Sequence, residues 1–232
     1  MKATIKRTFS NRRRVTAAAV AAAALLGTVG ATAAFADGSD DGGRDVSSSV
    51  RLSENRELDD TAKDLALVKA AKIGESEAAS AASKAVPGTV TSAELDDADR
   101  DGSVIWEVDV LGEDGKNHDV TVDAGNGEVL RQHVDSDDDT AEDLALVKAD
   151  RIGQDGATHQ ALQAVPGTVT SVELDDRDSG SVVWGIDVLG KDRKSHDVTV
   201  DAGSGKVLNQ HVDHDDHGDN GDGNSDDDGD DS

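Results

Sequence analysis

The sequence predicts an α+β protein with two tandem small modules. Each module is expected to be an α-helix packed on a three- to four-stranded antiparallel sheet, and both chain termini are expected to be disordered. Three observations lead to this prediction. Residues 60–134 and 139–212 are copies of one another, with 51 of 74 aligned positions identical, which marks a tandem duplication. Within each copy, an Ala-rich helical stretch precedes alternating strands and tight turns. Outside the copies, Asp, Gly and Ser predominate.

The first 36 residues have the organisation of a secretory signal peptide. Residues 1–14 carry six basic residues and no acid, and an Ala-rich apolar run follows. Ala34-Phe35-Ala36 then provides the small-x-small pattern of a signal peptidase site. The apolar run is also long enough to span a membrane, so a single N-terminal membrane anchor is the alternative. We expect cleavage near Ala36 and a secreted protein, either extracellular or in the cell envelope.

The charge of the chain excludes two classes of partner. Lys and Arg number 23 against 49 Asp and Glu, a net charge of −26. Cleavage after residue 36 removes six basic residues and no acid, which leaves 17 against 49 and a charge of −32. Such a chain cannot neutralise nucleic-acid phosphates or bind an anionic membrane surface. Because Cys is absent, disulfides, thiol nucleophiles and Cys-ligated zinc are excluded as well.

Each copy is expected to open with a short helix. Leu65–Lys72, which corresponds to Leu144–Arg151 in the second copy, fits either a short helix or a strand. The stripe formed by Leu65, Val68 and Lys72 favours the helix.

A second, Ala-rich helix is expected over residues 75–86. Gly74 and Gly153 separate it from the first helix, and Val-Pro-Gly ends it because proline cannot continue a helix. Its expected apolar face consists of Ala78, Ala81, Ala82, Ala85 and Val86 in the first copy, and of Ala157, Ala161, Leu162, Ala164 and Val165 in the second.

Three strands and a short fourth are expected after the second helix. The first two are predicted at Thr89–Leu95 and Ser103–Leu111, the third around Val120, and the fourth at 128–130. In the second predicted strand, apolar residues alternate with polar ones, which is typical of a half-buried strand. Its Trp106, like Trp184 in the second copy, is expected in the core, and a ligand platform is the alternative.

The same residues mark corresponding turns and strands in both copies. In the first copy they are Pro87-Gly88, Trp106-Glu107-Val108, Asp114-Gly115, Val122-Asp123-Ala124 and Gly127-Glu128-Val129. In the second they are Pro166-Gly167, Trp184, Val200-Asp201-Ala202 and Gly205-Lys206-Val207. This pattern resembles the PepSY family over both copies, about residues 60–212. At the position of Gly115 the second copy has Arg193, which is expected to lengthen or reshape its hairpin.

The resemblance implies a regulatory role. PepSY domains occur in propeptides of thermolysin-like metallopeptidases and in secreted or membrane-tethered bacterial proteins, and their implied role is to inhibit or regulate local peptidase activity. The sequence contains no His-Glu-x-x-His motif, so it carries no zinc peptidase of that type. Any peptidase would therefore be a separate protein, acted on in trans.

An Asp-rich turn resembles the start of a calcium loop. Asp97, Asp99, Asp101 and Gly102 fit loop positions one, three, five and six, but Val108 stands where a bidentate Glu is needed. The corresponding turn of the second copy, 176–180, is one residue shorter. We therefore expect solvated turns there and no specific metal site.

Histidines are the remaining candidate ligands. They form two corresponding pairs, with two more in the C-terminal tail: His118 and His196, His133 and His211, and His214 and His217. No Cys or clearly spaced carboxylate accompanies them, so partly buried or surface histidines are expected rather than a zinc site.

Together these observations predict a secreted, non-enzymatic protein without cofactors or catalytic residues. It contains no nucleophile elbow, phosphate loop or dinucleotide fingerprint. The predicted function is to modulate or inhibit an extracellular peptidase in trans, with a metallopeptidase as the candidate partner. The alternative is low-affinity binding or buffering of divalent cations such as calcium in the cell envelope. It is suggested by the charge and by residues 213–232, which contain ten Asp and two His. That acidic tail and the linker 37–59 are expected to be disordered.

Overall fold

The computed structural model describes residues 46–52, 59–98, 102–134, 140–177 and 180–212. The predicted signal peptide or anchor, residues 37–45 and 53–58 of the linker, and the acidic tail lie outside these residues. None of the helices in the described ranges has the length and apolar character needed to cross a bilayer.

Both modules contain two helices followed by four strands, which confirms the α+β prediction. The first module comprises α1 (Asp60–Ala70), α2 (Glu75–Ala85), β1 (Gly88–Asp97), β2 (Val104–Gly112), β3 (Asn117–Asp123) and β4 (Val129–Val134). The second comprises α3 (Thr140–Ala149), α4 (Gly153–Ala164), β5 (Gly167–Asp176), β6 (Val182–Gly190), β7 (Ser195–Asp201) and β8 (Val207–Val212). The opening stretch is helical in both copies, but the helices begin earlier than expected and end at Ala70 and Ala149, before Lys72 and Arg151. The fourth strand is longer than its sequence suggests.

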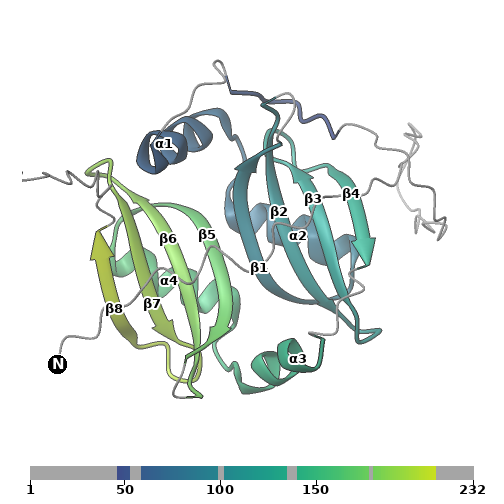
Figure 1. Cartoon of the computed structure of the whole chain (residues 1–232), viewed down its shortest axis with the longest axis vertical. Helices are drawn as coiled ribbons and strands as arrows, with labels where there is room; N and C mark the ends of the chain where they lie inside the picture. The colour runs from purple at the N-terminus through teal and green to yellow at the C-terminus, as the bar shows by residue number, and fades with distance from the viewer. Residues whose placement is uncertain (1–45, 53–58, 99–101, 135–139, 178–179, 213–232) are drawn as a thin grey trace, which may run out of the picture.

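The two modules share one eight-stranded sheet. Its order is β4-β3-β2-β1-β5-β6-β7-β8 (Figure 1), and all neighbouring strands are antiparallel. β1 joins β5 through three residue pairs, with Ala93 opposite Val172 at the centre. The modules therefore dock edge to edge, and each protects the first strand of the other from solvent.

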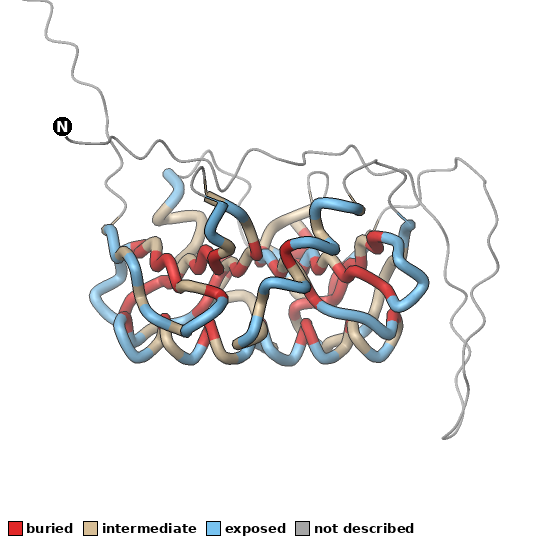
Figure 2. Tube along the Cα trace, turned by 90° about the horizontal axis from the view of Figure 1, so that it is seen from below, coloured by how far each residue is buried: buried red, intermediate tan, exposed pale blue. Residues whose placement is uncertain are grey.

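The core lies between the sheet and the two Ala-rich helices. α2 and α4 lie behind the sheet in Figure 1, and Figure 2 shows the buried residues as a band between exposed turns. Trp106 and Trp184 are 1% and 0% exposed, so both are core residues. Ala78 and Ala82 are fully buried in α2, and their small side chains let the helix approach the sheet closely.

The expected apolar face of the second helix is only partly correct. Ala79 is buried at 6% exposure, whereas Ala81 and Ala85 are half-buried. The buried stripe of α2 is therefore shifted toward Ala79. A face made largely of Ala gives little contrast from which its boundaries could be predicted.

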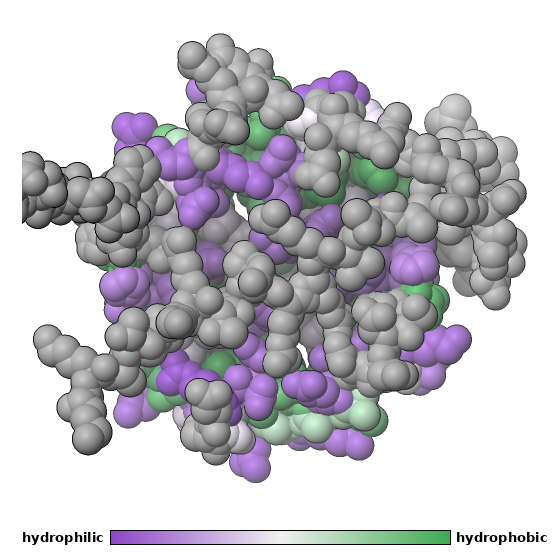
Figure 3. All heavy atoms as spheres, viewed as in Figure 1, coloured by the Kyte–Doolittle hydropathy of each residue, from purple (hydrophilic) through white to green (hydrophobic). Residues whose placement is uncertain are grey.

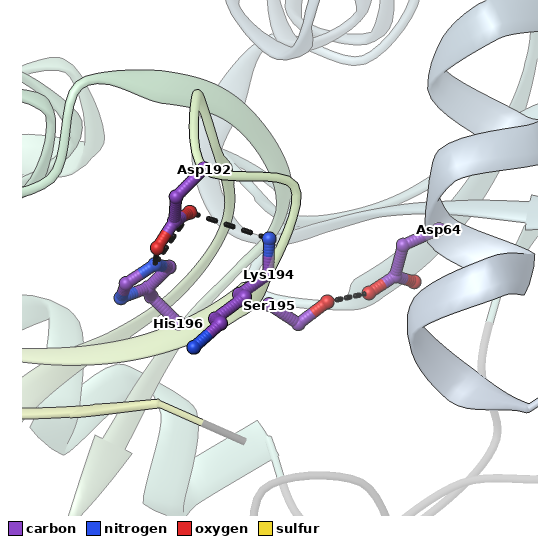
Figure 4. A network of polar contacts seen from close by, with 5 residues as sticks. All are labelled: Asp64, Asp192, Lys194, Ser195 and His196. Carbon is purple, nitrogen blue, oxygen red and sulfur yellow. Dashed lines mark hydrogen bonds and ion pairs between the residues drawn. The ribbon is translucent and has the colours of Figure 1, made fainter. Parts of the chain in front are cut away.

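The first helix of each module reaches across to the other module. α1 contacts β5 and β6, and α3 contacts β1 and β2. Ser195 Oγ donates a hydrogen bond to Asp64 Oδ2 of α1 at 2.5 Å (Figure 4), and Asn117 Nδ2 donates one to Asp143 of α3. These reciprocal contacts hold the two halves together beyond the β1–β5 pairing.

The β6–β7 hairpin keeps the length of its counterpart, so the expectation for Arg193 is wrong. Gly115 has a φ of +75°, and Arg193 adopts the same left-handed conformation with a φ of +65°. Arg193 N donates to Gly190 O at 2.8 Å, just as Gly115 N donates to Gly112 O at 2.9 Å. The turn geometry is set by the paired strands, and the arginine accepts an unfavourable φ to fit it.

Replacing Arg193 by glycine should therefore stabilise the protein. Removing the Cβ from a left-handed position should raise the free energy of unfolding by about 1 kcal/mol, which denaturant unfolding can measure. The reciprocal change Gly115→Arg should lower it by a similar amount. A loss of stability in Arg193→Gly would show that contacts of the arginine outweigh its backbone strain.

One carboxyl group is buried at the start of α2. Glu75 is 4% exposed, and its nearest polar partner is Ser76 Oγ, which donates to Oε2 at 3.1 Å. Burial raises the pKa of Glu75 from 4.5 to about 7. The Ser76 hydrogen bond opposes this shift, and the charge of Asp155 reinforces it. The folded protein therefore holds a proton there that the unfolded chain releases at a lower pH.

Stability should consequently fall as the pH rises from about 4.5 to about 7, since the folded state binds more protons in this range. In the wild type, the free energy of unfolding should decrease by an amount on the order of 2–3 kcal/mol between pH 5 and pH 8 because of Glu75. This decrease should be absent in Glu75→Gln. Glu113→Gln is the control, because Glu113 is exposed and Lys191 replaces it in the second module. Equal pH dependence in wild type and Glu75→Gln would contradict the assignment.

Candidate functional site

Module 1 binds an extended segment of its own chain at one end of its sheet. Val104 N donates to Val50 O at 3.0 Å, Leu52 N donates to Gly102 O at 2.8 Å, and Arg51 forms an antiparallel bridge with Ser103. β3 ends at Asp123, so the segment continues the sheet along β2 beyond that point. This is β-augmentation, in which main-chain hydrogen bonds capture an extended peptide.

The carboxylate of Asp123 anchors this segment. Its Oδ1 accepts hydrogen bonds from Ser48 Oγ at 2.8 Å, Ser49 Oγ at 2.9 Å and Gly125 N at 2.7 Å. Its Oδ2 accepts one from Ser49 N at 2.7 Å, and Ser48 N donates to Ser103 Oγ at 3.1 Å. Two adjacent serines thus supply most of the donors, so the site distinguishes a Ser-Ser sequence from an arbitrary strand.

These hydrogen bonds keep Asp123 ionised. Asp123 is only 2% exposed, and burial by itself would raise its pKa. The hydrogen bonds from Gly125, Ser48 and Ser49 outweigh burial and hold the pKa of Asp123 below its usual range. The anchor is therefore a carboxylate at neutral pH and loses strength only when acid protonates it.

A glycine makes the close approach of the segment possible. A Cβ on Gly125 would lie 2.3 Å from Ser49 Oγ and 2.8 Å from Val50 Cγ1. Both distances are shorter than real Cβ contacts, and Val50 could not remain in place beside an alanine. The site thus has three parts: a carboxylate, a glycine and the start of β2.

Sequence reasoning missed this site. Residues 46–52 fall within the linker 37–59, whose composition predicts disorder, yet they form the hydrogen bonds described above. A weak signal is present in the sequence, since Val46, Val50 and Leu52 all occupy even positions, as in a strand with one apolar face. The identical Asp-Ala-Gly sequence of both copies predicts a turn but not a binding site.

The Asp-rich turn is described only in part. Asp97 ends β1 and forms an ion pair with Lys63 Nζ of α1 at 3.0 Å, and the same ammonium lies 2.7 Å from Asp96. Residues 99–101 lie outside the described ranges, as do residues 178–179 of the corresponding turn. Asp97 is therefore engaged by a lysine in the described structure.

His118 and His196 are buried at equivalent places and pair with aspartates. Each is 7% exposed, and each Nε2 lies 3.1 Å from an oxygen of Asp114 or Asp192, four residues earlier. Figure 4 shows the second pair at the β6–β7 hairpin. The hydrogen bond from His118 is the main cause that lowers the pKa of Asp114, and His196 does the same for Asp192. The His118–Asp114 pair thus links the turn of the β2–β3 hairpin to β3, and the His196–Asp192 pair links the turn of the β6–β7 hairpin to β7.

The other predicted histidines are not gathered into one centre. His133 and His211 lie on β4 and β8, at opposite edges of the sheet, facing Asp119 and Asp197 in the pairing register. His214 and His217 lie outside the described residues. The two tryptophans donate to Ile73 O at 3.4 Å and to Asp150 Oδ1 at 3.2 Å, so their polar edges are used within the fold.

Carboxylates occupy the sheet face that points away from α2 and α4. Because Trp106 and Val108 face α2, the pleat turns Glu107 and Asp109 to the opposite face. In module 2, Asp187 is the counterpart of Asp109. Where grey atoms do not cover it, the described surface in Figure 3 is mostly hydrophilic, with smaller hydrophobic patches. Within the described ranges, no three His, Cys, Asp or Glu side chains converge in a way that could hold a metal ion.

Comparison with known families decides what the modules are. The family model described as "Peptidase propeptide and YPEB domain", PepSY, matches residues 72–133 and 151–211. The chain belongs to the PepSY family. Each match starts after the first helix of its module, so the bridging helices α1 and α3 and the docked segment 46–52 are additions to the matched PepSY regions.

Two further proteins resemble this PepSY chain. The uncharacterized protein YkoJ of Bacillus subtilis (strain 168) is 29% identical over 133 residues, which cover 56% of this chain and 72% of YkoJ. The crystal structure of a candidate lipoprotein from Clostridium difficile 630 aligns with a TM-score of 0.40 at 20% identity, covering 62% of this chain and 95% of the other.

Weakening the anchor should release the segment. Asp123→Asn removes the negative charge that accepts four hydrogen bonds, and such charge-assisted bonds contribute about 1.5–3 kcal/mol each. We expect trypsin to cleave after Arg51 about tenfold faster or more, followed by mass spectrometry of the Arg51–Leu52 bond. Asp201→Asn, the equivalent change in the other module, should leave this rate unchanged. Equal cleavage of Asp123→Asn and wild type would mean that Asp123 does not hold the segment.

Proposed function

We propose that this chain is an exported, non-enzymatic PepSY protein that modulates a separate extracellular peptidase in trans. The observation that carries the proposal is that both modules match a family described by peptidase propeptides. The N-terminal sequence, with its basic start, apolar run and Ala34-Phe35-Ala36 site, supports export. The sequence contains no His-Glu-x-x-His motif, and the proposal therefore takes the target to be a different molecule.

The way in which module 1 holds residues 46–52 suggests how such a protein engages its target. The sheet captures an extended strand by main-chain hydrogen bonds and adds side-chain specificity through a carboxylate. Within the described sheet, the outer strands β4 and β8 are further places where a strand could be added, and the large apolar residues Val134 and Leu208 on them are 39% and 42% exposed. Both kinds of surface favour a partner that presents extended backbone.

The two modules form one body, which affects how a target is bound. Because β1 pairs with β5 and the first helix of each module contacts both modules, the binding surfaces keep a fixed spacing and orientation. A partner with two matching segments gains from this only if its own geometry allows both to bind at once.

The proposal is tested by retention and inhibition. The intact chain is immobilised, secreted proteins are passed over it with and without chelator, and retained peptidase activity is assayed with increasing soluble chain. We expect a retained metallopeptidase whose activity falls as the chain is added. A variant lacking residues 213–232 is the control and should retain the same peptidase, since its sheet is unchanged.

Two results of this experiment would contradict the proposed function. If no peptidase is retained and the soluble chain slows none of the secreted activities, the modulator proposal is wrong. If the only binding detected is that of calcium, and it is lost in the tail-deleted variant, the acidic tail rather than the sheet is the functional part.

A further inference from the structure

Module 2 carries a second copy of the site that holds the segment in module 1. The contact residues of the first site are identical in the second. They are Ser103, Val104, Asp123, Ala124 and Gly125 in module 1, and Ser181, Val182, Asp201, Ala202 and Gly203 in module 2. The glycine before the second strand also has the same left-handed backbone in both, with φ of +68° at Gly102 and +75° at Gly180.

The two sites differ in what covers them. Ser103 is 0% and Asp123 2% exposed beneath the docked segment. Their counterparts Ser181 and Asp201 are exposed and half-buried, respectively, and Gly203 is exposed. Among the described residues, the only bridge outside the named strands is the one from Arg51 to Ser103. The described part of the chain thus fills the first site and leaves the second uncovered.

Gly203 shows that the second site still has room for a segment. A Cβ on Gly125 would collide with the docked serine and valine, whereas among the described residues a Cβ on Gly203 would meet nothing closer than Asp201 Oδ1 at 3.5 Å. The described part of the chain therefore imposes no steric need for glycine at position 203. Its backbone is not in the left-handed region either, so the described surroundings of Gly203 do not account for the missing side chain. An incoming strand does.

The anchor of the second site is present in its charged form. Asp201 Oδ1 accepts hydrogen bonds from Ser204 Oγ at 2.6 Å and Ser204 N at 2.8 Å. These bonds lower the pKa of Asp201, so the carboxylate is ionised at neutral pH. It lies at the protein surface, where hydroxyl and amide donors of another molecule can approach it.

We propose that module 2 binds an extended segment of a partner protein through Asp201, Gly203 and the start of β6, in the way module 1 binds residues 48–52. The segment carries two adjacent Ser or Thr residues followed by a β-branched or other apolar residue. It has no acidic residue beside them, since the surface of the chain is strongly negative. The hydroxyls and the first amides bind the carboxylate, and the following residue pairs with Val182.

The stoichiometry argues against a second copy of this chain as the occupant. Each chain has two sites and one segment of this sequence. If segments were exchanged between copies, each chain would still have one empty site, and the high effective concentration of an intramolecular segment would be lost. Residues 135–138, which lie between the two copies, contain three Asp and would be repelled by Asp201. A different protein is therefore the occupant that the sites favour.

This inference deepens the proposed function by naming a binding surface, and it depends on that function only for the identity of the partner as a peptidase. The test below contains no peptidase. Peptide binding can therefore succeed while peptidase modulation fails, and the two failures are distinguishable.

The probe is a capped peptide with the sequence of residues 46–52, Val-Ser-Ser-Ser-Val-Arg-Leu, added to the intact chain labelled with ¹⁵N. We expect saturable shifts of the amide signals of Val182, Ala202 and Gly203, with a dissociation constant of about 1 mM or tighter. The signals of Val104 and Gly125 should not move, because the chain's own segment occupies the first site. A peptide with Ala at the positions of Ser48 and Ser49 should produce no saturable shift.

Two variants make the assignment specific. Gly203→Ala has space in the free protein and should leave its spectrum otherwise unchanged, but it should weaken peptide binding by about tenfold or more, as the close contacts at Gly125 indicate. The double variant Ser48→Ala with Ser49→Ala weakens the chain's own segment without altering either site. It should allow the peptide to bind at Val104 and Gly125 as well, which raises the stoichiometry from one to two.

The proposal is overturned if the amide signals of the wild-type chain do not shift at peptide concentrations several-fold above the expected dissociation constant of about 1 mM. It is also overturned if Gly203→Ala binds the peptide as tightly as wild type. Sedimentation of the chain alone gives a further outcome: self-association that disappears in Gly203→Ala would show that a second copy, rather than another protein, fills module 2.

Discussion

The pairing of β1 with β5 is the contact on which the rest of the molecule depends. Only three residue pairs form it, yet it turns two four-stranded sheets into one of eight strands and removes two exposed edges. It also sets the distance over which α1 and α3 reach the opposite module. A module of about 75 residues with a single tryptophan-centred core would be marginal alone. The shared sheet lets each copy bury surface on the other.

Much of the fold could be predicted because the duplication repeats every local signal. The Val-Pro-Gly stop, the alternation around Trp106 and the Asp-Ala-Gly turn occur twice, so coincidence could be set aside. The joining of the modules could not be predicted, because β1 and β5 present Ser92, Glu94, Ser171 and Glu173 around their junction. Polar and charged residues at that place are typical of a solvent-exposed edge. The actual contact is marked by two central residues, Ala93 and Val172, rather than by a hydrophobic stripe.

The candidate site was harder to predict for a different reason. It combines a turn within the duplicated unit with a segment that lies before it, separated by about 75 residues in the sequence. Neither part is distinctive by itself, since an Asp-Ala-Gly turn is common and a Ser-rich stretch is typical of a linker. Arg193 is a similar case. Its residue type suggested a changed turn, but the strands on both sides impose the left-handed backbone.

The antiparallel junction has a consequence for the direction in which strands can be added. β1 and β5 run in opposite directions, and so do β2 and β6, which places the start of β2 and the start of β6 at opposite ends of the shared sheet (Figure 1). A single short peptide cannot reach from one end to the other. With its first end filled by its own chain, the molecule has one open end. With that segment displaced, it would have two ends facing away from each other, and it would then act as a bridge between two molecules rather than as a clamp around one.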